Sequence, residues 1–480
     1  MDERNLTLLM DFYELTMGNG YFMNGLKDRE AVFDAYFRVL PDKGGFAIMA
    51  GLEQVIAYME DLHFTEGDIA YLRSRKLFDE AFLDYLANFE FACDVWAIPE
   101  GTPVFPGEPL VTVRGPVIQA QMLETMTLLL LNHQCLIATK ANRIVRAAQG
   151  RAVMEFGSRR AQGADAANYG ARAAYIAGVV GSANTLTDRT MGIPALGTMA
   201  HSWVQLFGSE YEAFKAYAEV YPQDCTLLVD TYDVLQSGVP NAIRVFDECV
   251  VPRGYRPKGV RIDSGDIAYL SKRVRQMLDD AGYKDCAVVA SGGLDEYIIR
   301  DLFQQGAKLD SFGVGERLIT AKSDPVFGGV YKMVAVADDE GSLQPRIKIS
   351  ENIDKITTPG FKCPWRLFDR DSGKAIADVI SLADEQISED EPFTLFDPKA
   401  IWKRKVVNNF RAERLQVPIF EKGKLVYQRP DVDDIRQYCA EKMDTLWEEV
   451  TRFENPHKYY VDFTYDLWQL REDMLMRHRV

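Results

Sequence analysis

The sequence predicts an α/β protein whose central part is an α/β barrel. From about Ala152 to Val336 it repeats a short β-branched run, a turn of small or polar residues and a helical stretch. Successive units of this kind require parallel strands with helical crossovers, which leaves a doubly wound sheet or a closed barrel. The barrel is favoured because polar residues or glycines end nearly every run. Barrel enzymes build their active sites on the rim formed by the carboxyl ends of the strands.

Five runs mark the expected strands, and their ends supply most of the candidate site. They are 152–156, 226–230, 259–263, 287–291 and 311–315. Between the third and fourth runs, residues 267–281 carry apolar side chains at helical spacing, and a second helix is expected over 295–305. A further strand over 193–198 is expected to end just before a histidine.

The segments on either side mix helices and strands without this repeat, and they predict a second domain. Helices are expected over 6–23, 52–62, 68–91 and 465–479, and strands over 31–40 and 346–350. A chain of 480 residues exceeds what one core usually organises. We therefore expect residues 1–135 to form the N-terminal part of an α+β domain and 136–340 to form the barrel with the active site. Residues 341–480 would return to the first domain and add a C-terminal helical extension.

Composition restricts the partners and the location. The net charge of −16 disfavours nucleic acid and anionic membranes, which are bound through accumulated positive charge. Residues 1–5 lack the basic and apolar regions of a secretory signal, and no apolar run is long enough to span a membrane. Seven scattered cysteines, an odd number, argue against a disulfide framework and favour the cytoplasm. The five histidines form no metal-binding pattern, so no metal ligands are assigned.

Two glycine-rich turns on consecutive late strands predict a phosphate site. Ser291, Gly292 and Gly293 follow the fourth run, and Gly313 and Gly315 close the fifth. Glycines let backbone N–H groups approach a phosphate closely, and the late strands of barrels commonly hold one. A single turn of this kind is equally well explained as a tight turn, but two in succession favour phosphate.

Charged side chains at strand ends are candidates for binding an anion and a sugar. Arg261 and Asp263 alternate on one strand and therefore share a face, which suits an anion and a sugar hydroxyl respectively. The alternative is an internal salt bridge. Arg159 follows the first run, in Glu155–Arg160, and offers a planar fork to a carboxylate or phosphate unless it lies on the surface.

The segment Gly197–Ser202 places His201 after a small-residue turn, where Thr198 and Ser202 could orient its ring. A lone histidine is more often structural, but this one lies between two other rim motifs. No Walker phosphate-binding loop is present, so any use of ATP must proceed without one. The run 227–233 superficially resembles the flavodoxin-like phosphoribosyltransferases, but no threonine-rich phosphate loop follows and we reject that assignment.

Taken together, seven motifs resemble the nicotinate phosphoribosyltransferase family, among the type II phosphoribosyltransferases. They occur in the family's order within the first 332 residues, at 11–17, 155–163, 197–202, 260–266, the Ser-Gly-Gly turn, 313–315 and 328–332. The resemblance implies an irregular, TIM-like barrel packed on an α/β domain formed by both chain ends. It also implies a homodimer with its active sites at the interface.

The implied reaction makes nicotinate mononucleotide and pyrophosphate from nicotinate and phosphoribosyl pyrophosphate, coupled to ATP hydrolysis, for NAD biosynthesis or salvage. His201, Arg261 and Asp263 would be catalytic, with His201 phosphorylated by ATP and Mg²⁺ shielding the pyrophosphate. Phe156 and a partner subunit's tyrosine, equivalent to Tyr13, would sandwich the ring. Arg261 and Thr198, with Arg159, would hold the carboxylate or nearby phosphates, Asp263 the ribose and the glycine turns the 5′-phosphate.

Several alternatives stay open at this stage. The nicotinamide-using relatives generally supply an aspartate for the amide, and the comparable stretch 180–185 has no carboxylate. An aldolase would need a lysine at a strand end, and the five runs contain none. A non-catalytic barrel that binds a phosphorylated ligand would have no use for His201. Glu316 stands where some relatives have a threonine and is left unassigned.

Overall fold

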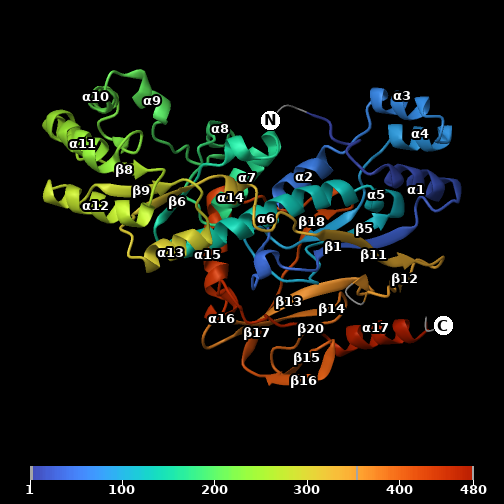
Figure 1. Cartoon of the computed structure of the whole chain (residues 1–480). Coiled ribbons are helices and arrows are strands. Elements are labelled where there is room, and N and C mark those ends of the chain that lie inside the picture. The colour runs from blue at the N-terminus through green and yellow to red at the C-terminus, as the bar shows by residue number, and fades with distance from the viewer. Residues whose placement is uncertain (1–3, 353–354, 478–480) are drawn as a thin grey trace. The chain divides into compact units, whose positions relative to one another are not determined.

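The chain divides into two units in the computed structural model, which describes residues 4–352 and 355–477. The first unit comprises Met1–Leu136 and Val326–Val480, and the second comprises Ile137–Pro325. The first boundary falls within helix α6 (Glu124–Ala147). Because both chain ends belong to the first unit, the second is an insertion into it (Figure 1).

The second unit contains a five-stranded parallel sheet in the order β6-β10-β9-β8-β7. All five predicted strands are present, as β6 (Ala152–Glu155), β7 (Thr226–Leu228), β8 (Gly259–Ile262), β9 (Ala287–Ser291) and β10 (Ser311–Val314). Single parallel bridges from Glu155 to Ser182 and from Ser182 to Ala195 continue the row beyond β6. Since the strands are parallel, the residues that follow them gather at one edge.

Helices connect these strands and cover them. They are α7 (Ala164–Ile176), α8 (Thr185–Met191), α9 (His201–Leu206), α10 (Glu210–Val220), α11 (Val239–Val245), α12 (Ile267–Asp280), α13 (Glu296–Gln304) and α14 (Glu316–Ile319). Asp266 begins α12 by accepting a hydrogen bond from the Tyr269 N–H at 3.0 Å, and Val274 and Leu278 on its inner face are fully buried. The predicted helices over 267–281 and 295–305 are thus confirmed as α12 and α13.

The strands of the first unit pair antiparallel, except that β20 runs parallel to β14. A seven-stranded sheet has the order β12-β11-β1-β5-β3-β18-β19. Its strands are β1 (Glu30–Phe37), β3 (Asp94–Ala97), β5 (Val111–Pro116), β11 (Gly329–Ala337), β12 (Leu343–Pro345), β18 (Val417–Glu421) and β19 (Lys424–Leu425). A four-stranded sheet contains β17 (Phe410–Arg414), β13 (Lys362–Asp369), β14 (Ala375–Leu382) and β20 (Val461–Phe463). The remaining strands pair as β15 (Phe393–Asp397) with β16 (Ala400–Val407) and β2 (Ala47–Ile48) with β4 (Pro103–Val104).

The helices of the first unit come from both chain ends. They are α1 (Phe12–Met23), α2 (Leu52–Glu60), α3 (Glu66–Ser74), α4 (Glu80–Ala87), α5 (Val117–Gln121), α15 (Val432–Asp444), α16 (Glu448–Thr451) and α17 (Tyr465–Arg477). None of the helices in the described part of the chain combines the length and apolarity needed to cross a membrane.

A buried ion pair lies at the centre of the four-stranded sheet. Arg366 on β13 donates to both carboxylate oxygens of Asp378 on β14, at 2.7 and 2.6 Å, and also to the Pro103 carbonyl at 2.8 Å. Both side chains are at most 1% exposed. Phe105 and Tyr459 stack with their ring centroids 3.9 Å apart, and the guanidinium lies over both rings. Such a pair is costly to break from one side, because the remaining charge stays buried.

Three sequence predictions need correction. Residues 193–198 form no strand: Ala195 makes one bridge, and Pro194 lacks the N–H that a ladder requires. Residues 346–350 are irregular, because the Lys348 N–H donates to Thr357 Oγ1 at 2.9 Å in a local loop. The single helix expected over 68–91 is two helices, α3 and α4, separated by a turn in which Lys76 has a φ of 56°.

Candidate active site

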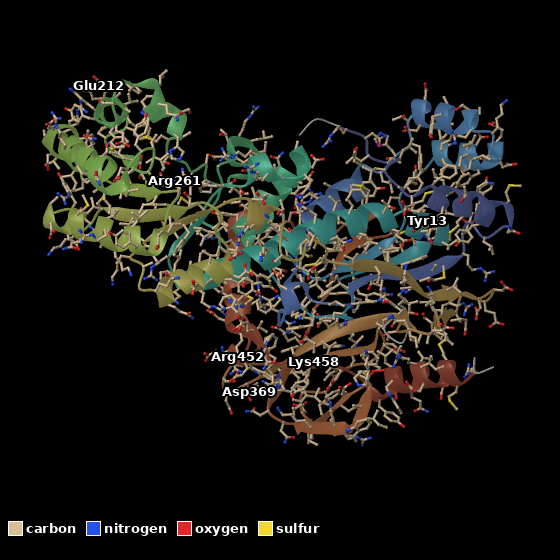
Figure 2. The ribbon with its side chains drawn as sticks, viewed as in Figure 1. Tyr13, Glu212, Arg261, Asp369, Arg452 and Lys458 are labelled. Atoms are coloured by element: carbon tan, nitrogen blue, oxygen red, sulfur yellow. The ribbon has the colours of Figure 1, made fainter. Side chains whose placement is uncertain are left out.

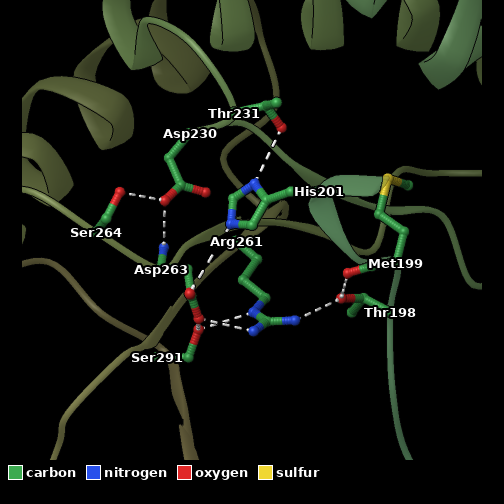
Figure 3. Close-up of polar contacts among 9 residues, drawn as sticks. All are labelled: Thr198, Met199, His201, Asp230, Thr231, Arg261, Asp263, Ser264 and Ser291. Atoms are coloured by element: carbon green, nitrogen blue, oxygen red, sulfur yellow. Dashed lines mark hydrogen bonds and ion pairs between the residues drawn. The ribbon is translucent and has the colours of Figure 1, made fainter. Parts of the chain in front are cut away.

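Arg261 is the hub of a polar cluster at the carboxyl edge of the parallel sheet (Figure 3). Its Nε donates to Ser291 Oγ at 2.8 Å, its Nη1 to Thr198 Oγ1 at 3.2 Å and its Nη2 to Asp263 Oδ1 at 2.8 Å. The cluster therefore joins the ends of β8 and β9 to the loop before α9. Arg261 and Asp263 form the internal salt bridge that was the alternative to an anion site. A guanidinium held by three partners is also preorganised, and its role in binding an anion stays a prediction.

Asp263 keeps its carboxylate ionised although it is partly buried. Burial raises its pKa, but hydrogen bonds from Ser291 and Arg261 together with the Arg261 charge outweigh this, so the pKa lies below the ordinary value. Its side chain remains 31% exposed. A carboxylate held by an arginine and a hydroxyl, yet open to solvent, can still accept hydrogen bonds from a ligand.

His201 is the first residue of α9, and its ring faces the cluster. Nδ1 lies 3.1 Å from Thr231 Oγ1, and Nε2 lies 3.9 Å from Asp263 Oδ2. With Nδ1 donating to Thr231, Nε2 carries the lone pair of the neutral ring. The side chain is 40% exposed, so Nε2 is accessible to a reactant.

Phe156 supplies an apolar surface beside Arg261. The guanidinium carbon lies 5.4 Å from the centre of its ring. A Cβ added to Gly313 would stand 2.5 Å from two ring carbons of Phe156, so only glycine leaves room for the ring in this position. The glycine at 313 is therefore required by ring packing, whatever its backbone contributes to binding phosphate.

The Ser-Gly-Gly turn after β9 adopts a conformation that favours glycine. Gly292 and Gly293 have φ angles of 90° and 65°, and a Cβ on Gly292 would lie 2.0 Å from the Asp263 carbonyl oxygen. This close approach brings the turn against the end of β8. Gly293 is open, because a Cβ added there would meet no atom within 4 Å.

The turn after β10 is lined by ion pairs. Gly315 directly precedes α14, and Glu316, to which the sequence assigns no role, pairs with Lys322 at 2.7 Å. Arg317 forms an ion pair with Asp295 at the start of α13. The carboxylate of Glu316 is thus compensated by a lysine and needs no metal ion to offset its charge.

The predicted site residues Ser202, Arg159 and Tyr13 lie outside the hydrogen-bonded cluster and are not at the strand ends that form it. Ser202 is exposed on α9, and Arg159 is exposed in the short 3₁₀ turn Ser158–Arg160. Tyr13 belongs to the first unit, on α1, and is 41% exposed. Burial, then the carboxylate of Glu124, raises the pKa of Tyr13, which keeps its phenol protonated.

Sequence reasoning misses two residues that follow β7. Asp230, 8% exposed, accepts from the Asp263 N–H at 3.1 Å and from Ser264 Oγ at 2.6 Å. Its neighbour Thr231 contacts His201. The signal that could have found them is their position after a strand of the same parallel series. The comparison of residues 227–233 with the flavodoxin-like phosphoribosyltransferases hides that signal.

Glu155, at the end of β6, is also part of the framework. It is fully buried, and it accepts hydrogen bonds from the Gly157 N–H and from Ser182 Oγ, the latter at 2.6 Å. Burial raises its pKa, although both hydrogen bonds oppose the shift. Glu155 thereby fixes the turn that carries Phe156 against the 180–185 stretch.

The described residues include no group of three or more His, Cys, Asp or Glu side chains placed to hold a metal ion. Asp230 Oδ1 is a buried carboxylate oxygen without a hydrogen-bond partner. Because Mg²⁺ is often held by one or two carboxylates together with substrate phosphates, this oxygen suits an ion that arrives with a pyrophosphate group.

Comparisons with known proteins agree over nearly all of the chain. Three family models match: the nicotinate phosphoribosyltransferase N-terminal domain at 8–132, the family model at 151–355 and the C-terminal domain at 361–471. The chain is 44% identical to the nicotinate phosphoribosyltransferase of Bacillus subtilis, over 97% of this chain and 94% of that protein. It is 30% identical to the human one, over 95% and 94%. The crystal structure of human nicotinic acid phosphoribosyltransferase has a TM-score of 0.85 at 28% identity, covering 97% of this chain and 99% of that one.

Proposed function

The chain belongs to the nicotinate phosphoribosyltransferase family, and from this premise we propose that it joins nicotinate to phosphoribosyl pyrophosphate at the Arg261 cluster. The enzyme serves NAD biosynthesis or salvage. The observation that carries the assignment is the guanidinium of Arg261, fixed by three partners between the ring of Phe156 and the ionised Asp263. A planar cation beside an aromatic face matches a pyridine ring that bears a carboxylate.

Nicotinate would bind with its ring on Phe156 and its carboxylate on Arg261. A guanidinium has five N–H donors, and three of those on Arg261 already bind the protein. The two that remain, one on each terminal nitrogen, match the two oxygens of a carboxylate. Tyr13, supplied by a partner subunit, would cover the other face of the ring.

The ribose and its phosphate would occupy the adjoining strand ends. Asp263 accepts from the ribose hydroxyls, and the turns at Ser291–Gly293 and Gly313–Gly315 receive the 5′-phosphate. The pyridine nitrogen then bonds to the anomeric carbon as the bond from that carbon to pyrophosphate breaks, and the electron pair leaves with pyrophosphate. The protein's share of the catalysis is to align the two reactants and to stabilise the developing charge.

His201 would serve as the phosphate carrier that couples the reaction to ATP. With Nδ1 held by Thr231, Nε2 bonds to the γ-phosphorus of ATP as the bond from that phosphorus to ADP breaks. Hydrolysis of phospho-His201 returns the resting enzyme. Mg²⁺, bound at the free oxygen of Asp230, would neutralise charge on pyrophosphate, and Arg159 and Ser202 would contact the phosphates.

Recognition of nicotinate over nicotinamide is supported by the stretch 180–185. An amide NH₂ would need an acceptor there, but the Ser182 hydroxyl is bound to Glu155 and the Asn184 amide donates to Asn168 at 2.7 Å. Glu155, the nearby carboxylate, already accepts two hydrogen bonds and is buried. A nicotinamide NH₂ directed at this stretch would therefore lose its water without gaining an acceptor there.

A homodimer, a closed barrel and a cytoplasmic location complete the proposal. Several large apolar side chains on and just before α1, the helix of Tyr13, are exposed: Leu9, Phe12, Met17 and Met23. Exposed apolar side chains that form a patch are typical of a surface that another protein covers. The bridges beyond β6 extend the parallel row toward the barrel expected from the sequence. All seven cysteines are free thiols, as cytoplasmic proteins generally keep them.

The phosphohistidine step can be tested by labelling. Incubation with ATP carrying a labelled γ-phosphate should put label on the protein that is stable to base and labile to acid. The His201→Ala variant should take up none, whereas His63→Ala, which removes an exposed histidine of the first unit, should label normally. Equal labelling of His201→Ala would overturn the assignment.

A further inference from the structure

The first unit contains a large cavity that the proposed reaction does not use. Its volume is about 810 Å³, within the range of small-molecule sites and far more than a single ion fills. Residues of β1 and the loop that follows it, of the loop after β4 and of the segment 455–463 form its walls. None of the residues of the Arg261 cluster lines it.

Positive charge accumulates in this cavity although the protein carries a net charge of −16. Arg38, Lys43 and Lys458 line it and make no ion pair with any carboxylate of residues 4–352 and 355–477 (Lys458 is labelled in Figure 2). Arg38 Nε is buried and has no hydrogen-bond partner. By contrast Lys362, also on the wall, is neutralised by Asp34 at 2.8 Å. The lining holds six basic side chains, Arg38, Lys43, Lys362, Lys399, Lys458 and Arg471, against the carboxylates of Asp34, Asp397 and Asp462, and this excess of positive charge favours an anionic ligand.

The loops that carry these cations hold strained backbone. Lys43 and Asn455 line the cavity with positive φ angles of 50° and 48°, and Asp42, directly before Lys43, has one of 52°. Non-glycine residues are uncommon in this conformation, although Asp and Asn adopt it more readily than Lys, and backbone strain of this kind concentrates at ligand-binding positions. The fold thus maintains Lys43 at the cavity at some cost in stability.

The rest of the lining matches the other parts of a nucleotide. Tyr36, His457 and Tyr460 are among the aromatic residues that line the cavity. Asp462 is 5% exposed, and its carboxylate forms no hydrogen bond or ion pair with the described residues. Burial, then repulsion by Asp397, raises its pKa to about 6, opposed by Lys458. A carboxylate with unused acceptors suits sugar hydroxyls, and aromatic rings suit a planar base.

We infer that this cavity of the first unit binds a nucleoside monophosphate, with the phosphate on Arg38, Lys43 and Lys458, the sugar hydroxyls on Asp462 and the base among the aromatic rings. The site is independent of the proposed catalytic site, because no residue is shared between them. Nucleotide binding in this cavity does not depend on nicotinate being the substrate of the catalytic site.

Isothermal titration of the full-length protein with AMP tests this inference. In a double variant, Lys43→Glu with Lys458→Glu, one AMP-binding event should weaken at least tenfold, because the charge reversal repels the phosphate. Both lysines are exposed, so folding should be kept. A matched double variant, Lys403→Glu with Lys424→Glu, makes the same change of charge at exposed positions outside the cavity and should bind AMP as the wild type does.

Titration of a catalytic-site variant and titration with parts of AMP show which site binds AMP and which groups it recognises. Arg261→Ala should leave this binding event intact, whereas its loss would assign the event to the catalytic site and overturn the inference. Adenosine and inorganic phosphate alone should each bind at least tenfold more weakly than AMP. Absence of AMP binding, equal binding by the cavity variant or phosphate binding as tight as AMP binding would each contradict the proposal. Arg38→Gln, measured alongside, should weaken AMP binding without reversing any charge.

Discussion

Replacing Arg261 with alanine should abolish most of the enzyme's preference for nicotinate. The two N–H groups of Arg261 that the protein does not use would form two hydrogen bonds to the substrate carboxylate. Each hydrogen bond to a charged group contributes about 1.5–3 kcal/mol, so the loss amounts to about 3–6 kcal/mol. At about 1.4 kcal/mol for each factor of ten, kcat/KM for nicotinate should fall by about 10² to 10⁴.

The assay is steady-state formation of nicotinate mononucleotide, with nicotinate, ATP and phosphoribosyl pyrophosphate varied in turn. Arg261→Lys keeps the charge but loses the planar fork, and it should recover only part of the activity. Arg256→Ala removes an exposed arginine paired with Asp285 and should change kcat/KM little. A fall of less than threefold for Arg261→Ala, or equal effects on nicotinate and ATP, would refute the role given to Arg261.

Three other substitutions test the framework around the site. Gly313→Ala should displace the ring of Phe156 and lower kcat/KM for nicotinate by up to about 100-fold, as misplacement of a binding group can; unchanged kinetics would contradict that packing. Burial raises the pKa of Glu14 from 4.5 to about 7, so the wild type loses stability as the pH rises between these values. Glu14→Gln should therefore gain up to about 3 kcal/mol over the wild type at pH 8 relative to pH 4, measured by urea unfolding, and identical pH dependence would count against it. Asp378→Asn leaves Arg366 buried without its counter-ion and should cost about 3–5 kcal/mol, whereas a cost below 1 kcal/mol would show that the pair is dispensable.

The parallel sheet was predictable because its strands are short β-branched runs that end in polar residues or glycine. β6, β7, β8, β9 and β10 all lie within the predicted runs, and two intervening helices follow their apolar spacing. The closed barrel that the sequence also predicts is a different matter, because closure depends on pairing between the two edges of the sheet, and the described strands form a five-stranded sheet with two single bridges beyond β6. The expected strand at 193–198 failed because Pro194 limits pairing to a single bridge.

The candidate site was predictable where a residue type and its position agree. Arg261, Asp263 and Ser291 lie at the ends of β8 and β9, and they meet Thr198, from the loop before α9, in one hydrogen-bonded cluster. Asp230 is missed when its neighbourhood is compared with another motif, although its place after β7 follows the same rule. Contacts such as the one between Gly313 and Phe156 depend on the packing of adjacent strands, which sequence spacing alone does not specify.

The most direct measurement of the central claim is turnover of nicotinate against nicotinamide, each with phosphoribosyl pyrophosphate and each with and without ATP. We expect nicotinate mononucleotide and pyrophosphate to form in equal amounts from nicotinate, and faster when ATP is present. Nicotinamide should be consumed at least 100-fold more slowly, because its binding would leave a buried polar group without a hydrogen-bond partner. Equal turnover of the two pyridines, or no pyrophosphate release with nicotinate, would contradict the account.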